Sequence, residues 1–406
     1  LVLAGSYLLG MLGDAIYRRW LAPAAGAGRQ PLIVALVLLA LALRLGGMLH
    51  PYAIFSDLGL NRHNLEGVAR GEIYFTEGLP SEAGGGDAPY PPGQYLLLAP
   101  ALLALPGGDD ALNALIKVGN ALADSLALAL IWLLLRRSGY SERAALLGAG
   151  LYLLPGPMLS SLSVGEFANV AGQALALPLL IYAGMQARDL GTRRARIALA
   201  ALLGIALLGH LGVTISLFGV LAALLLAWML RPATRPASRA LLVGGALVAA
   251  LIVLFYYTAL LDVLLARLGS PGAASASLAK KVQDQINRTT VLRLSALLVA
   301  LGAIGGVLAG LRQRRWAHAW VQPAYGTLLS AWWAGTVLSL GLLLFASQGV
   351  RWQAFFYPAL CLGGGPALDQ LWKRGRAGRA MLIAAASFLL WNGLEFWIRQ
   401  IYYYLH

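Results

Sequence analysis

The sequence predicts an all-α, polytopic transmembrane helix bundle of about 11–12 spans. Hydrophobic residues make up 59% of the 406-residue chain and charged residues only 12%, whereas soluble domains carry about 25% charged residues. Long apolar runs recur along the chain and are separated by polar segments. In lipid every backbone polar group must be satisfied internally, and runs of this length favour helices over barrel strands. We therefore expect one transmembrane domain over residues 1–406.

Each long apolar run is a predicted membrane span. These runs lie at 1–17, 31–49, 111–135, 144–162, 169–187, 240–261, 291–311, 320–345, 352–371 and 380–398. Residues 96–106 are apolar but too short to cross a bilayer, which takes about 20 residues, so they predict an interfacial or re-entrant helix. The run 197–230 is too long for one ordinary span, and we expect it to break at 209–212, Gly-His-Leu-Gly.

The net charge of +14 is explained by membrane topology. Most of the 31 basic residues fall in alternate loops, at 18–30, 136–143, 188–196, 231–239, 312–318 and 372–379. The positive-inside rule makes these loops cytoplasmic, and contact with anionic lipid accounts for their charge better than nucleic-acid binding does. We therefore expect a multi-pass protein of the plasma (inner) membrane, with loops 50–110 and 262–290 on the outer face.

The longest polar segment, 50–95, concentrates the candidate chemistry. Its acids are Asp57, Glu66, Glu72, Glu77, Glu82 and Asp87. Ser56 predicts the cap of a juxtamembrane helix that begins at Asp57. Asp57, Asn61 and Asn64 would share one face of that helix because they are spaced at i, i+4 and i+7. The pattern fits a functional carboxylate, and it also fits an interfacial helix with a solvated acid.

The residues that follow Asp57 contain two short tyrosine-bearing motifs, Gly-x-x-Tyr and Tyr-Pro-Pro-x-x-Tyr. They are Gly71 and Tyr74, then Tyr90, Pro91, Pro92 and Tyr95. Over about residues 31–137 this arrangement resembles the GT-C superfamily of polyprenyl-phosphate-sugar-dependent membrane glycosyltransferases. The resemblance implies that a sugar passes from a polyprenyl-phosphate carrier to a hydroxyl of an outer-face glycan or lipid acceptor. It also implies that Asp57 is the general base, since the acceptor must lose a proton as it attacks.

The sequence departs from parts of the family pattern. Some members carry two adjacent acids at this point, whereas here the neighbour of Asp57 is Ser56. Oligosaccharyltransferase members add a metal site and a large soluble C-terminal domain, whereas this chain ends at His406. We therefore expect no metal, no peptide acceptor, and no cofactor other than the lipid-linked sugar donor as co-substrate.

Other outer-face residues are candidates for substrate binding. Glu166 is either a second acid facing the site or a solvated loop acid, and His210 is either a site residue or a histidine bonded at a helix break. By resemblance Arg351 binds the donor phosphate, and the alternative is an interfacial anchor. A sugar and one phosphate between Asp57 and Arg351 would separate the two side chains by roughly 8–15 Å.

Three further residues of the first loop, Asp87, Asn61 and Tyr90, are also expected to contact substrate. Asp124 lies inside the predicted span 111–135, where it is either a proton-relay or a packing residue.

Three other functions remain open at this point. A transporter or flippase of a lipid-linked substrate should show paired broken helices in two repeated halves, and the sequence offers one break, at 209–212. An O-antigen ligase or polymerase would place its large outer loop late in the chain, whereas here the largest is early. A non-catalytic membrane scaffold would share the fold, and Asp57 decides between it and an enzyme.

Overall fold

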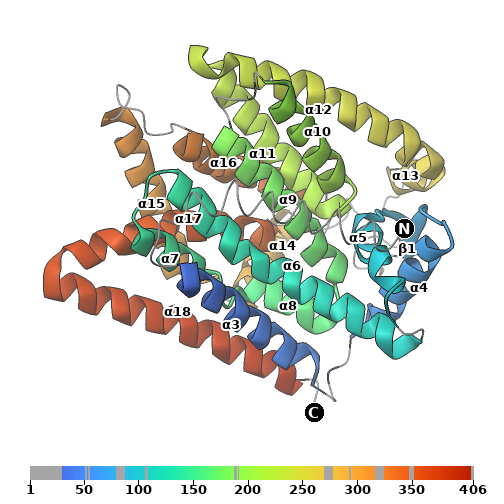
Figure 1. Ribbon diagram of the computed structural model, residues 1–406, viewed down its shortest axis with the longest axis horizontal. Helices are drawn as coiled ribbons and strands as arrows, with labels where there is room; N and C mark the ends of the chain where they lie inside the picture. Colours follow the sequence, from blue (N-terminus) through green and yellow to red (C-terminus); the bar gives the residue numbers. More distant parts are fainter. Residues whose placement is uncertain are drawn as a thin grey trace.

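The computed structural model describes residues 30–50, 53, 55–78, 87–105, 108–186, 190, 192–268, 278–291, 294–315, 324–346 and 352–403. These residues form a helical bundle with a two-stranded hairpin (Figure 1). The first half comprises α3 (Gln30–Met48), α4 (Leu58–Ala69), β1 (Phe75–Gly78), β2 (Asp87–Tyr90), α5 (Gly93–Leu102), α6 (Asp109–Arg137), α7 (Glu142–Leu151), α8 (Gly156–Val164) and α9 (Phe167–Gln186). The second half comprises α10 (Arg193–Leu207), α11 (Leu211–Met229), η5 (Pro232–Thr234), α12 (Arg235–Phe255), η6 (Tyr257–Leu260), α13 (Leu261–Leu268), α14 (Leu278–Val291), α15 (Ala296–Arg315), α16 (Ala324–Ala346), α17 (Trp352–Lys373) and α18 (Gly375–Tyr403).

Six helical segments of the described chain are long and apolar enough to cross a membrane. They are Asp109–Arg137, Glu142–Val164, Phe167–Gln186, Leu211–Met229, Arg235–Phe255 and Gly375–Ile401. The protein is thus a multi-pass membrane protein with an all-α bundle, as the sequence predicts, although fewer helices meet this criterion than the 11–12 expected. The predicted span 1–17 lies outside the described residues.

The predicted interruptions of the apolar runs are confirmed. α10 ends at Leu207 and α11 begins at Leu211, which places the break of the long run at 208–210. α5 has 10 residues and is too short to span, as expected.

The span 144–162, predicted as one helix, is instead divided into α7 and α8. Pro155 has no N–H to donate and ends the helical hydrogen-bond pattern before it.

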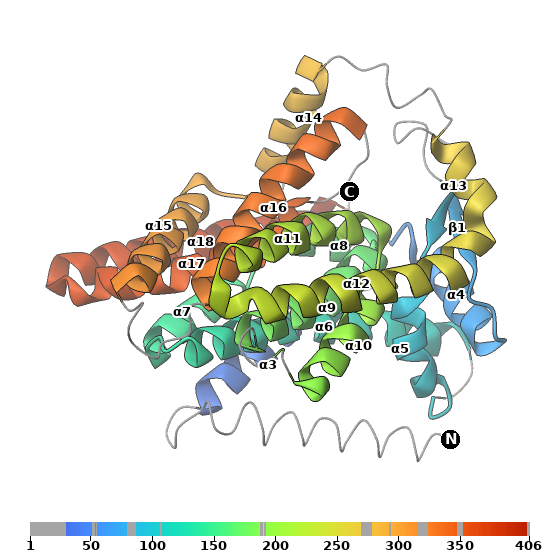
Figure 2. The same ribbon diagram turned by 90° about the horizontal axis from the view of Figure 1, so that it is seen from above.

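The elements of the long polar segment after α3 gather at one end of the bundle. α4, β1 and α13 lie together there in both views (Figures 1 and 2), and α13 packs against β2. α12 runs along an edge of the bundle beside α10 and α11 (Figure 1). The short hairpin pairs β1 and β2 antiparallel, with Phe75 opposite Tyr90 and Glu77 opposite Ala88.

α17 is the central helix, because every residue from Gln353 to Asp369 is buried. It packs against α7, α15 and α16. The contacts with α7 and α15 need residues without a side chain: a methyl group on Gly365 would run into the Ala144 carbonyl, and one on Gly363 into that of Gly302. Small residues let helix backbones approach closely, which is how membrane helices gain packing energy without a hydrophobic driving force.

A buried ion pair ties α3 to α6 inside the bundle. Arg44 Nε lies 2.6 Å from Asp124 Oδ2, and the two side chains are 0% and 2% exposed. The same guanidinium donates to the Leu153 carbonyl at 3.0 Å, an acceptor that the break after α7 leaves without a helical partner. Tyr152 donates to Asp124 Oδ1 at 2.7 Å and accepts from Gln173 on α9. Asp124 therefore serves as the counter-charge of Arg44. Through Tyr152 it also links α6 to the segment after α7 and to Gln173 on α9.

Candidate active site

The Asp57 carboxylate stands at the head of α4 without capping that helix. An N-cap aspartate usually accepts a hydrogen bond from an N–H of the first turn, but Asp57 makes no such bond. The Ser56 hydroxyl lies 2.8 Å from both Asp57 Oδ1 and the Val164 carbonyl oxygen, and shares its one proton between them. Asp57 Oδ2 accepts no hydrogen bond from the residues that the structure describes. Among the described residues, one oxygen of this partly buried carboxylate therefore carries no hydrogen bond.

A glycine turn brings Glu166 beside the Asp57 segment. Gly165 ends α8 in the left-handed conformation, at φ +86°. A Cβ at this position would lie 3.1 Å from Phe55 Cβ and 3.4 Å from the Asp57 backbone nitrogen. Glycine thus allows both the backbone conformation and the close approach of the two segments. The next residue, Glu166, accepts from Asn169 at 3.0 Å.

Asn61 fixes the geometry of this junction. Its side-chain amide donates to the Asp57 carbonyl at 2.7 Å and to the Gly165 carbonyl at 3.4 Å. Its Oδ1 accepts from the Tyr95 hydroxyl on α5 at 2.9 Å, and Asn64 lies beside the same hydroxyl. Asn61, a predicted substrate-binding residue, is fully buried. Its side chain holds α4, α5 and the Gly165 turn together around Asp57.

The tyrosines of the Gly-x-x-Tyr and Tyr-Pro-Pro-x-x-Tyr motifs form an aromatic cluster with residues of the β1–β2 hairpin. Tyr90 stacks on Tyr95 with ring centroids 6.3 Å apart, and Phe75 meets Tyr95 edge-on at 6.0 Å. Tyr74 stacks on Tyr256, whose hydroxyl donates to the Tyr90 carbonyl at 3.0 Å. Tyr90, a predicted substrate-binding residue, is only 5% exposed because it packs within this cluster. The cluster attaches the hairpin to the end of α12.

Glu77 on β1 is a site carboxyl that the sequence alone does not single out. The pKa of Glu77 is raised from 4.5 to about 7, mainly by partial burial and to a lesser extent by the nearby charges of Asp57 and Glu166. The carboxyls of Asp57 at the head of α4 and Glu166 in the turn before α9 are therefore close enough to Glu77 on β1 to raise its pKa. The carboxyl of Glu77 changes its charge near neutral pH, which is the range useful for proton transfer.

Lys117 is a cation close to the segment that carries Asp57, although it is not among the groups that shift the pKa of Glu77. Its ammonium lies 4.1 Å from the centroid of the Phe55 ring, a cation–π contact, and Phe55 precedes Asp57 by two residues. The other strong cations of the described stretches 55–78 and 87–117 form ion pairs, Arg62 with Asp109 and Arg70 with Glu72. Lys117 makes no ion pair with the described residues. Its position two turns into α6 gives no local signal of this role.

His210 lies at the helix break, in contact with α9. It is the N-cap residue of α11 in an extended conformation, and a Cβ on Gly172 would lie 2.6 Å from His210 Cβ. The preceding Leu208 carbonyl accepts from the N–H of Gly93, the first residue of α5, at 2.7 Å. The break is thus adjacent to the start of α5, but His210 is not among the groups that shift the pKa of Glu77.

Two predicted site residues remain, Asp87 and Arg351. Asp87 is exposed at the start of β2, opposite Gly78, and it does not contribute to the shifted pKa of Glu77. Its contact with substrate stays a prediction. Arg351 lies outside the described residues, so its predicted distance from Asp57 stays a prediction. Within the described part of the chain, no three His, Cys, Asp or Glu side chains are grouped so as to hold a metal ion. Independence of metal likewise stays a prediction.

Comparison with solved structures relates this architecture to that of oligosaccharyltransferases. The structure of the Archaeoglobus fulgidus oligosaccharyltransferase in complex with Zn and sulfate matches 91% of this chain, with a TM-score of 0.59 and 15% identity. Its apo form matches 93% of the chain, with a TM-score of 0.59 and 14% identity. The chain shares the fold of these oligosaccharyltransferases over the matched residues. The resemblance predicted from the loop motifs is thereby confirmed at the level of fold.

A third matching structure contains a dolichol-phosphate. Archaeal oligosaccharyltransferase AglB from Archaeoglobus fulgidus, in complex with an inhibitory peptide and a dolichol-phosphate, has a TM-score of 0.56 and 15% identity over 91% of this chain. The chain spans only about half the length of these proteins, 53–56%. No protein-family model and no curated protein matches the sequence.

Proposed function

We propose that the protein is a membrane glycosyltransferase that moves a sugar from a polyprenyl-phosphate carrier to an acceptor hydroxyl on the outer face. The observation that carries the proposal is the Asp57 carboxylate, with one oxygen held by Ser56 and the other open, at the head of α4 in a GT-C fold. A complex of the structurally similar AglB with dolichol-phosphate supports a lipid-phosphate donor.

The proposed reaction divides its charges between Asp57 and Lys117. The acceptor hydroxyl gives its proton to the open oxygen of Asp57 as its own oxygen bonds to the anomeric carbon. The bond from that carbon to the phosphate oxygen breaks, and the electron pair leaves with the polyprenyl phosphate. The Lys117 ammonium stabilises this departing negative charge. Asp57 then releases its proton to water, which restores the carboxylate.

The test is a transfer assay on the purified protein with polyprenyl phosphates that carry different labelled sugars, in which release of polyprenyl phosphate is measured. A membrane scaffold or a flippase with this fold would give no release above that of the protein-free mixture. Transfer of the label to a glycan or lipid hydroxyl then identifies the acceptor class.

Replacing Lys117 with methionine is expected to lower kcat/KM for the donor roughly 10–150-fold, the contribution of a hydrogen bond to a charged group. Lys117→Arg should keep most of the activity because it keeps the charge. The matched control is Lys373→Met, which removes a lysine that is paired with Asp369 at the C-terminal end of α17. Donor kinetics like those of the wild type in Lys117→Met would exclude the phosphate role.

Donor binding is expected to weaken as the pH rises through about 7, because Glu77 then becomes a carboxylate. An anionic phosphate bound nearby raises the pKa of Glu77 further, so donor binding takes up a proton and is favoured at lower pH. The phosphodiester of the donor keeps one negative charge over this range. Between pH 6 and pH 8 the affinity should fall about fivefold if the donor raises that pKa by one unit, and by at most about tenfold for larger shifts, because binding takes up no more than one proton.

The variant Glu77→Gln should lose this pH dependence and bind the donor at pH 8 as the wild type does at pH 6. Glu72→Gln is the matched control, since Glu72 is an exposed acid of the same loop paired with Arg70. An unchanged pH profile of donor affinity in Glu77→Gln would assign the titration to another group.

A further inference from the structure

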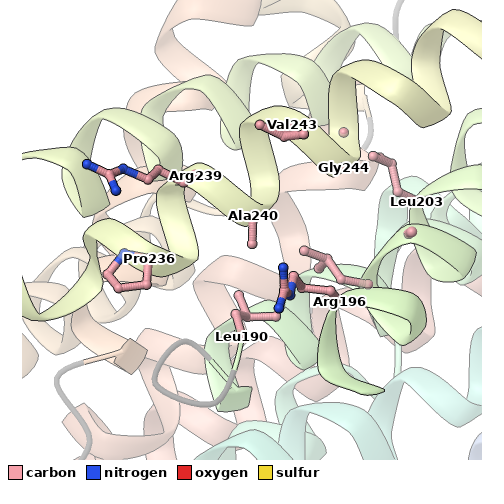
Figure 3. Close-up of a pocket in the computed structure, with 11 residues that line it drawn as sticks. Leu190, Arg196, Leu203, Pro236, Arg239, Ala240, Val243 and Gly244 are labelled. Atoms are coloured by element: carbon pink, nitrogen blue, oxygen red, sulfur yellow. The ribbon is translucent and has the colours of Figure 1, made fainter. Parts of the chain in front are cut away.

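A cavity lies between α10 and α12, which carry none of the carboxyls of the candidate active site. It has a volume of about 510 Å³, within the range of roughly 300–1,000 Å³ typical of ligand pockets. Its walls are mainly apolar and include Leu199, Leu203 and Val243. Arg196 and Arg239 line it as well, and the Arg196 side chain extends between the two helices beneath Ala240 (Figure 3).

The cavity belongs to the half of the bundle remote from α4 and α5. α10 begins at Arg193 and ends at Leu207, and the Leu208 carbonyl that follows accepts a hydrogen bond from Gly93 of α5. Roughly 16 Å of helix separates Arg196 from Leu207, at 1.5 Å per residue. A ligand in this cavity is therefore bound near the arginine-rich ends of the helices and apart from Asp57.

The surroundings of the cavity match an amphiphile with an anionic head. The described residues from 192 to 255 include no Asp or Glu. They include the arginines Arg193, Arg194, Arg196, Arg231, Arg235 and Arg239. Along α12 only Ala237, Ser238 and Leu241 are buried, and the helix exposes Leu242, Val243, Leu247, Leu251, Val253, Leu254 and Phe255. Positive charge thus lies at one end of a cleft that continues into an apolar, lipid-facing surface.

We propose that this cavity is a binding site for an anionic phospholipid. The phosphate of the lipid meets Arg196 between the two helices, and one acyl chain lies between α10 and α12 along Leu203 and Val243. The Arg239 guanidinium points away from Arg196 (Figure 3) and adds its positive charge at the edge of the cavity. Arginine suits this position because its planar guanidinium binds phosphate oxygens in pairs. The lipid fills a space that the two helices leave open and holds α12, which buries few of its own side chains, against the bundle.

The test uses the purified full chain in detergent with phosphatidylglycerol and phosphatidylcholine of identical acyl chains. Bound lipid is counted by native mass spectrometry, and the Tm is measured in each lipid. The wild type should bind phosphatidylglycerol in preference and should gain Tm from it. The double variant Arg196→Gln/Arg239→Gln should lose about thirtyfold in affinity for phosphatidylglycerol, since each arginine near an anionic headgroup contributes about fivefold.

The matched control is Arg193→Gln/Arg235→Gln, which removes the same charge from the first residues of the same two helices but outside the cavity lining. It should bind phosphatidylglycerol nearly as the wild type does. Ala240→Phe, which fills the cavity and keeps both arginines, should reduce binding of both lipids. Equal binding of the two lipids by the wild type, or equal loss in the two arginine double variants, would overturn the proposal.

Discussion

Replacing Asp57 with asparagine is expected to slow sugar transfer about 10²–10⁴-fold, the usual contribution of a general base. The amide keeps the size and shape of the side chain and can still accept from Ser56, whose hydroxyl lies 2.8 Å from Asp57 Oδ1. It cannot take up the proton of the acceptor hydroxyl. The loss should therefore fall on kcat at saturating donor, and donor affinity should change much less.

The matched control for this variant is Asp87→Asn. Asp87 is an acid of the same loop, but it is exposed at the start of β2 and is not part of the group formed by Asp57, Glu77 and Glu166. The fold of both variants is checked by their Tm in detergent, because Asp57 makes no side-chain cap whose loss would destabilise α4. Turnover equal to that of the wild type in Asp57→Asn would remove Asp57 from the chemistry, and Glu77 would be the next candidate base.

The second large effect concerns stability, and it comes from Asp124→Asn. This change leaves the Arg44 guanidinium inside the bundle without its counter-charge, although the two side chains are almost completely buried. Removing one partner of a buried ion pair costs about 3–5 kcal/mol in the free energy of unfolding. The measurement is unfolding of the purified protein by a denaturing detergent, followed by its helical circular dichroism.

A double variant separates the charge from the packing. In Arg44→Met/Asp124→Leu neither charge is buried, and the destabilisation should be well below that of Asp124→Asn, since apolar residues of similar volume often replace buried ion pairs at little cost. The surface pair of Arg70 and Glu72, both about half exposed, provides the comparison. Glu72→Ala should change the free energy of unfolding by less than about 1 kcal/mol. A double variant no more stable than Asp124→Asn would assign the effect to shape rather than to the unpaired charge.

The features that the sequence predicts correctly are local ones. The break between α10 and α11 follows from an apolar run longer than one span, and α4 follows from the polar spacing after Asp57. The predicted cap is wrong in detail, because Asp57 rather than Ser56 is the N-cap residue and the Ser56 hydroxyl bonds to Asp57 and Val164 instead. Asp57 at the head of that helix is part of the same local pattern. These features depend on neighbours a few residues away, which one sequence reveals.

The features that the sequence does not predict depend on distant contacts. β1 and β2 are four residues each, and β2 contains Pro89, so neither has a clear strand pattern. Glu77 is distinguished from the other loop acids only by its partial burial near Asp57 and Glu166. Lys117 belongs to a long apolar helix, and its position over the Phe55 ring arises from the packing of α6 against the loop. Arg44 looks unfavourable inside an apolar run until Asp124 is placed beside it.

The burial of α17 also determines how the protein can be inserted into a membrane during synthesis. The helix is enclosed by protein from Gln353 to Asp369 and is not among the segments apolar enough to cross a bilayer unaided. α7 and α15, which pack along α17, precede it in the chain and leave the ribosome first. We therefore expect membrane integration of α17 to be coupled to its docking on helices that are already in place.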